Sequence, residues 1–259
     1  MPHRRARIFI GFMLGIWSLS LIGNHAIPAG ILNSASAADD CETMPQEAAP
    51  EVEDHAAGIS FRLLGQKYLQ THNWECAIDA FSRSITLLGP HSPNSILSQE
   101  LLARAYEQGE LLDNAEKEWL QLLNRFGGTS DYDYDRRSEF LSKLGLFYMR
   151  QGRESEAEKR YLDAIELFES HDAGSSFIRE ETYGFLARLY ESQDRYSLAA
   201  DAASGVVSTI ESTVEQVPEE TDLLIVALKE RARLLELAGR VDEAREDLAR
   251  AENLSGQHL

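Results

Sequence analysis

The sequence of 259 residues has little of what catalytic and metal sites are usually built from. Its two cysteines, Cys41 and Cys76, do not form a C-x-x-C pair, and its seven histidines are scattered outside any H-E-x-x-H arrangement. Glycine-rich phosphate loops and a serine in a nucleophile-elbow context are also missing. Because an enzyme needs reactive groups that converge, we expect no catalytic residue, no cofactor and no resident metal.

Positive charge is scarce as well. The chain has 25 Lys and Arg against 43 Asp and Glu, a formal net charge of −18 with a pI near 4.8. A surface selected to neutralise phosphates is basic, so nucleic acid is excluded as an expected partner, and so is an anionic membrane surface.

Acidic residues are absent only from the N-terminal end, residues 1–37. Three arginines there precede the uncharged run 8–22, and the small residues Ala35-Ser36-Ala37 follow. This order is typical of a secretory signal peptide, which we expect to be cleaved after Ala37. The protein would then be periplasmic or secreted, with no membrane segment beyond the signal peptide. An uncleaved anchor is the alternative, since the weakly apolar stretch that follows could lengthen the span.

The segment 38–57 is acidic, rich in Ala and Pro, and without apolar periodicity, so it is predicted to be a disordered linker. It contains Cys41, whereas Cys76 lies in the following domain. In an oxidising compartment the two can form a disulfide bond. Alternatively, Cys76 is a small buried helix residue and Cys41 a free thiol.

A pattern of small and aromatic residues recurs five times over residues 58–254. The clearest copy has Leu64-Gly65, Tyr68, Ala77 and Phe81. Small residues let two antiparallel helices cross closely, and the aromatic rings fill the space around the crossing. The later copies place equivalent residues at Ala103, Tyr106, Ala115, Trp119, Gly145, Tyr148, Ala157, Tyr161, Ala187, Tyr190, Ala199, Ala232 and Ala244, and the last two copies are degenerate.

These residues resemble the tetratricopeptide repeat (TPR) family. The resemblance implies an all-α, right-handed α-solenoid of about five antiparallel helix pairs, with repeats at 58–91, 96–129, 138–171, 180–213 and 225–258. Successive signature alanines are 38, 42, 42 and 45 residues apart, a spacing similar to that of kinesin light chain-type arrays. Helices or loops must therefore be longer than in the usual 34-residue repeat. Gly109, Gly152 and Gly239 are expected to end first helices in a left-handed conformation.

The resemblance also implies that the first helix of each pair lines a concave groove. The candidate groove residues are Arg62, Gln66, Arg104, Lys143, Arg150, Arg188, Lys229 and Arg233. Their positive bias predicts a partner protein with an acidic or carboxylate-bearing segment. The alternative is that these cations pair with glutamates on the same or neighbouring helices, as solvated helix faces usually do.

Residues 131–135 (DYDYD) carry three alternating carboxylates, as at the start of a calcium loop. Arg136 and Ser142 occupy the positions where that loop needs glycine and glutamate, which favours a solvated acidic loop between repeats. A polar last helix, about 241–254, is expected to cap the array.

The predicted function is therefore a non-catalytic adaptor or scaffold of the bacterial cell envelope. Two alternatives remain open. One is a structural protein that self-assembles, for instance as a homodimer, through its end repeats. The other is an enzyme with an unrecognised metal-dependent site in the 131–135 segment.

Overall fold

The computed structural model describes residues 41, 52–90, 92–215, 217 and 220–257. The expected signal peptide lies outside these residues, as does the expected linker except for Cys41 and residues 52–57. In the described part the secondary structure is helical throughout. The helices are α1 (Val52–Gln70), α2 (Trp74–Leu88), α3 (Pro93–Gln108), α4 (Leu112–Arg125), α5 (Asp131–Arg150), α6 (Glu154–His171), α7 (Ser176–Ser192), α8 (Tyr196–Val214), α9 (Thr221–Leu237) and α10 (Val241–Gln257).

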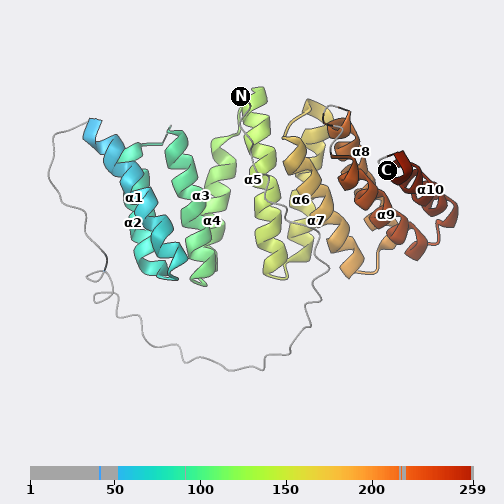
Figure 1. The fold of residues 1–259 in the computed structure, drawn as a ribbon. Coiled ribbons are helices and arrows are strands. Elements are labelled where there is room, and N and C mark those ends of the chain that lie inside the picture. The colour runs from blue at the N-terminus through green and yellow to red at the C-terminus, as the bar shows by residue number, and fades with distance from the viewer. Residues whose placement is uncertain (1–40, 42–51, 91, 216, 218–219, 258–259) are drawn as a thin grey trace.

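The helices pack as consecutive pairs, α1 with α2 through to α9 with α10, and each pair packs on the next in chain order (Figure 1). The predicted all-α solenoid of five helix pairs is confirmed. Among the described residues, no helix combines the length and the apolar character needed to cross a bilayer.

The small residues of the repeat pattern mark helix crossings, as expected. A Cβ atom added to Gly65 would lie 2.6 Å from the ring of Phe81, and one added to Gly145 would lie 2.6 Å from the ring of Tyr161. Both rings are fully buried. The signature alanines Ala77, Ala103, Ala115, Ala157, Ala187, Ala199, Ala232 and Ala244 are buried, as are Trp119, Tyr148 and Tyr190, whereas Leu64, Tyr68 and Tyr106 are half-buried. The pattern therefore encodes the contacts inside the pairs.

The first helices begin earlier than predicted. Helix α1 starts at Val52, so residues 52–57 are not part of a disordered linker. Ala56 and Ala57 favour helix, and the next turn is fixed on α2, where Ser84 donates a hydrogen bond of 2.7 Å to the carbonyl of Gly58. The other first helices likewise start at residues 93, 131, 176 and 221, instead of 96, 138, 180 and 225. The extra length of these repeats thus lies in their helices.

The turns inside the pairs correct one glycine assignment. Gly152 and Gly239 have positive φ angles, 68° and 76°, as predicted. Gly109 does not, with φ −85°; the next residue, Glu110, takes the left-handed conformation with φ 60°. A Cβ on Gly109 would lie 3.2 Å from the Cβ of Trp74, so this glycine is explained by close packing instead.

The acidic segment 131–135 is the first turn of α5 and not a loop, which corrects the sequence-based expectation. Ser130 and Asp133 form a reciprocal capping box at this helix start. Asp135 accepts a hydrogen bond of 2.7 Å from the backbone N–H of Gly174. Carboxylates are favourable at a helix N-terminus, because the helix dipole is positive there. Two of these acidic groups therefore have structural partners.

The two ends of the array differ in character. At the N-terminal end Cys41 and Cys76 form a disulfide bond with a Cα–Cα distance of 5.4 Å, and Cys76 is buried at the start of α2. At the C-terminal end α10 buries Ala244 and Ala251 against α9, while most of its remaining surface is exposed and polar. The last helix thus has the polar outer side that a terminal repeat needs for solubility.

Candidate functional site

The structure places the predicted groove cations on first helices, but carboxylates hold several of them. Lys143 on α5 is 2.7 Å from Glu100 on α3 and 2.7 Å from Glu139. Arg150 lies 3.2 Å from Glu107. These ion pairs link α3 to α5, so they join neighbouring repeats and lower the net positive charge along the array.

Near the C-terminal end a predicted groove cation is also held by carboxylates. Arg233 on α9 is 2.8 Å from Glu191 on α7 and 2.6 Å from Glu230. At the N-terminal end, Arg62 donates a hydrogen bond of 3.4 Å to Gln66. Three of the seven predicted cations, Lys143, Arg150 and Arg233, are therefore paired with glutamates on their own helix or on the preceding first helix.

The other predicted cations are solvent-exposed: Arg104 on α3, Arg188 on α7 and Lys229 on α9. The guanidinium of Arg188 lies 5.9 Å from the ring centroid of Phe185. Burial raises the pKa of Glu181 on the same helix, and Lys143 and Arg188 act in the opposite direction. The predicted groove residues are thus spread along five helices and do not converge on one charged site.

Two of the repeat tyrosines belong to an inter-repeat cluster that sequence reasoning missed. The hydroxyl of Tyr148 donates a hydrogen bond of 2.8 Å to Glu116 in the preceding pair, and Arg153 donates to the same carboxylate. The guanidinium of Arg153 stacks over the Tyr148 ring at 4.3 Å. Arg153 and Tyr148 lower the pKa of Glu116 through these hydrogen bonds, Arg153 having the larger effect.

The cluster recurs one repeat later with Tyr190, Glu158 and Arg195. Tyr190 donates to Glu158 at 3.0 Å, and Arg195 donates to both oxygens of that carboxylate, at 2.8 and 3.0 Å. Spacings of 42 residues between equivalent members could have revealed it in the sequence. We call each of these groups, Tyr148–Glu116–Arg153 and Tyr190–Glu158–Arg195, a repeat clamp. The clamps give these polar residues a structural role at the junctions between helix pairs.

Arg231 on α9 stands where the other repeats have leucine. It pairs with Asp247 on α10, donating a hydrogen bond of 2.6 Å from Nε to Oδ2, and the Asp247 side chain is only 7% exposed. Asp247 accounts for the departure from the repeat pattern, because a buried carboxylate needs an opposite charge.

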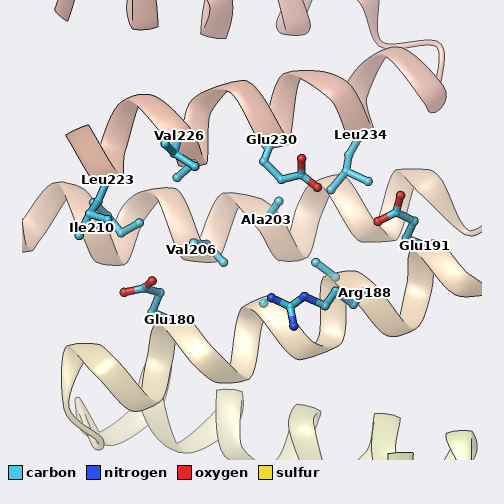
Figure 2. Close-up of a pocket in the computed structure, with 13 residues that line it drawn as sticks. Glu180, Arg188, Glu191, Ala203, Val206, Ile210, Leu223, Val226, Glu230 and Leu234 are labelled. Carbon is cyan, nitrogen blue, oxygen red and sulfur yellow. The ribbon is translucent and has the colours of Figure 1, made fainter. Parts of the chain in front are cut away.

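A groove with an apolar lining lies between α7 and α9, and α8 forms its floor (Figure 2). The groove is shallow and open to solvent, with a cavity volume of about 70 Å³. Its apolar lining residues are Gly184, Ala187, Ala203, Val206, Ile210, Leu223, Val226, Ala227 and Leu234, and its charged lining residues are Glu180, Arg188, Glu191 and Glu230. Val226, on the α9 wall of the groove, is 47% exposed.

The groove combines predicted and unpredicted residues. Arg188 was predicted, and Arg233 bridges two of the lining glutamates. The apolar groove residues on α9 were missed in the sequence analysis. They belong to an unbroken apolar run, 223–228 (LLIVAL), although a helix that packs on neighbours with only part of its surface needs apolar residues only on that part. Gly184 lies three residues before the small residue of its repeat, as Arg62 and Lys229 do in theirs, and a Cβ added there would meet no atom within 4 Å.

The described residues offer little for chemistry. Among them, no three His, Cys, Asp or Glu side chains lie close enough together to hold a metal ion. The arrangement instead suits binding, because it combines an apolar surface with charged groups at its rim.

Comparison with known proteins identifies the fold. No family model matches the sequence, and no curated protein matches it. Solved structures do match. One is a variant of a kinesin light chain-type protein of Podosopora anserina with nearly identical TPR-like repeats, 20% identical, with a TM-score of 0.57 over 81% of this chain and 99% of the other. BtubC (BKLC) from P. vanneervenii is 16% identical, with a TM-score of 0.59 over 80% and 83% of the chains. The apo form of RapI is 14% identical, with a TM-score of 0.52 over 82% and 87%. The resemblance to TPR-like repeat proteins is therefore confirmed at the level of the fold.

Proposed function

We propose that this TPR-like repeat protein is an exported, non-catalytic scaffold of the bacterial cell envelope, which binds a partner protein on its first-helix face. By the first-helix face we mean the side of the array formed by α1, α3, α5, α7 and α9. TPR-like folds are interaction scaffolds in general, and such solenoids present extended binding surfaces. The observation that carries the proposal is the apolar groove between α7 and α9, since a concave, mostly apolar surface with a few charged groups suits binding.

Export is supported by two independent features. The N-terminal sequence has the order of a signal peptide, as described above. The disulfide bond between Cys41 and Cys76 is of a kind that persists in oxidising compartments and is rare in the cytosol.

The proposal can be tested with a photo-crosslinking amino acid placed in the protein in living cells. At Val226, inside the groove, illumination should give a discrete adduct with another protein. At Leu162 on α6, which is 45% exposed but lies on a second helix, the same reagent should give none. Equal labelling at both positions, or no adduct from any first-helix position, would contradict the proposed function.

A further inference from the structure

A larger recess lies among α6, α7 and α8 (Figure 1) and is separate from the groove. Its cavity volume of about 510 Å³ is within the range of about 300–1,000 Å³ that is typical of small-molecule sites. The end of α6, the turn after it, the N-terminal half of α7 and one side of α8 line it. The groove floor on α8 carries Val206 and Ile210, whereas the recess is lined by Ser208 and Ser212, about half a turn around the helix. The two sites share no lining residue.

Small residues on α8 leave the recess open. Gly205 and Ser208 line it, whereas α6 has Asp163 and Glu166 at the positions one repeat of 42 residues earlier. A Cβ atom on Gly205 would lie only 2.3 Å from the ring of Tyr183. Glycine at this position therefore allows the ring to lie against the backbone of α8. The small side chains on α8 are thus particular to this helix and not a general property of the repeat.

The apolar surface of the recess is aromatic. The rings of Phe168 and Tyr183 have centroids 6.1 Å apart. Phe168 is buried and Tyr183 is half-buried, so Tyr183 is the ring that a ligand can reach. Among the described residues that line the recess, none is Ala, Val, Leu, Ile or Met. The recess therefore lacks the surface that an aliphatic side chain or an acyl chain would need.

Hydrogen-bonding groups of both kinds lie around this ring. Arg179 is ion-paired with Asp172, whose side chain is 95% exposed and can accept further hydrogen bonds. Ser176 and Ser208 are exposed, and a hydroxyl group both donates and accepts. A ligand with several hydroxyl groups can use donors and acceptors together.

The charges in the recess leave little net charge. Arg179 and Asp172 cancel each other, so Glu169 supplies the remaining negative charge. Glu169 lies close enough to Tyr183 to raise the pKa of its hydroxyl, although burial is the larger cause. The Tyr183 hydroxyl therefore stays protonated and remains a donor. Such a site does not favour a strongly charged ligand.

We propose that the recess among α6, α7 and α8 binds a neutral oligosaccharide. One sugar ring packs on Tyr183, and its hydroxyl groups exchange hydrogen bonds with Asp172, Ser176 and Ser208. A sugar fits because its C–H faces pack on aromatic rings, its hydroxyls donate and accept, and it carries no charge. The site goes beyond the proposed function, since a sugar and a partner protein would occupy different surfaces.

The test uses the full chain without its signal peptide and four trisaccharides. Chitotriose, cellotriose and maltotriose are neutral, and trigalacturonic acid is anionic. Saturation-transfer NMR should show contact with at least one neutral trisaccharide, and calorimetric titration should give a Kd below about 1 mM. Trigalacturonic acid should bind more weakly. Added salt should leave the binding of the neutral sugar unchanged, because no charge is screened.

Two pairs of variants locate the site. Ser208→Tyr fills the recess and should weaken sugar binding by about tenfold or more, whereas Ser197→Tyr, at an exposed position of α8 outside the recess, should have no effect. Tyr183→Leu removes the ring but supplies the residue that α5 has at the matching position, Leu141. It should weaken binding by about fivefold, whereas Tyr183→Phe keeps the ring and should retain most of the affinity. Circular dichroism checks that each variant is folded.

Three results would each overturn the proposal: no binding of any neutral trisaccharide, tighter binding of trigalacturonic acid, or full binding by folded Ser208→Tyr. None of them bears on the scaffold function, which is tested by crosslinking at Val226 in the separate groove.

Discussion

The hydroxyl of Tyr190 and the carboxylate of Glu158 are joined by a hydrogen bond of 3.0 Å across the junction between two helix pairs. Arg195 holds the same carboxylate through both of its oxygens. This contact links two consecutive repeats through residues 32 positions apart, so it should contribute to the cooperativity of unfolding.

Replacing Glu158 with glutamine should therefore destabilise the protein at neutral pH and have little effect in acid. Hydrogen bonding from Arg195, the larger cause, and from Tyr190 lowers the pKa of Glu158 in the folded protein. Its stabilising effect is thus fully present above the unfolded carboxyl pKa of about 4.3 and is lost as the pH falls through the lower folded value. Urea denaturation of wild type and variant should differ at pH 7 and converge in acid. A constant difference across this range would contradict the role of the charge.

The Arg231–Asp247 pair should behave as a unit. Arg231→Leu alone leaves a buried carboxylate without its partner and should cost about 3 kcal/mol, at the low end for buried pairs, since Arg231 is 20% exposed. Combining Arg231→Leu with Asp247→Ala, which restores residues found in other repeats, should recover most of this loss. A double-mutant cycle measures the coupling. Additive effects of the two substitutions would show that the pair is not coupled.

Reduction of the disulfide should destabilise the oxidised chain. The bond joins residues 35 positions apart. Closing such a loop lowers the entropy of the unfolded chain, which stabilises the folded protein by at most about 4 kcal/mol. Urea denaturation with and without dithiothreitol measures the effect. The double variant Cys41→Ala/Cys76→Ala is the control and should not respond to dithiothreitol, and thiol titration of the unfolded wild type should detect no thiols before reduction.

Glu110→Gly should stabilise the turn between α3 and α4. Glu110 has a φ of 60°, which is unfavourable for a residue with a Cβ atom, and the equivalent positions in two other pairs are already glycine. We expect a gain of about 0.5–1 kcal/mol in the free energy of unfolding, reduced by the added freedom of the unfolded chain. Gly152→Glu should lower the free energy of unfolding by a comparable amount. Thermal unfolding of the two variants and the wild type measures both effects.

Export should remove the N-terminal segment. Expressed in a bacterium with its full sequence, the protein should be recovered from the envelope or medium with Ala38 as its first residue, as judged by intact mass. Ala37→Leu should impair cleavage, because the peptidase pocket accepts only small residues there. Recovery of uncleaved protein from the cytosol would contradict the proposed location.

The fold could be predicted from the sequence because small and aromatic residues mark each crossing directly. Gly65 and Phe81 are in contact, and the pattern that pairs them repeats along the chain. Helix starts were predicted less well, since they depend on tertiary contacts such as that between Gly58 and Ser84. Local composition alone could not show those contacts.

The site was harder to predict than the fold. Choosing cations by helix position identified Lys143 and Arg150, but their net charge depends on glutamates from the preceding helix pair. The groove itself is formed by side chains from three helices, α7, α8 and α9, so no single stretch of sequence defines it. Gly184 gave a local signal of the open space, because glycine is unfavourable in the middle of a helix and no packing contact explains it there.

The two complete repeat clamps sit at the α4–α5 and α6–α7 junctions. There the helix backbones approach less closely than at α2–α3 and α8–α9. In mechanical terms the central junctions are held through long side chains, the clamps together with the stacked rings of Phe126 on Phe140 and of Tyr161 on Phe185, whereas the outer junctions are held by close backbone contact. Bending should therefore concentrate at the two clamped junctions, so that the array behaves as stiff end segments joined by a compliant centre.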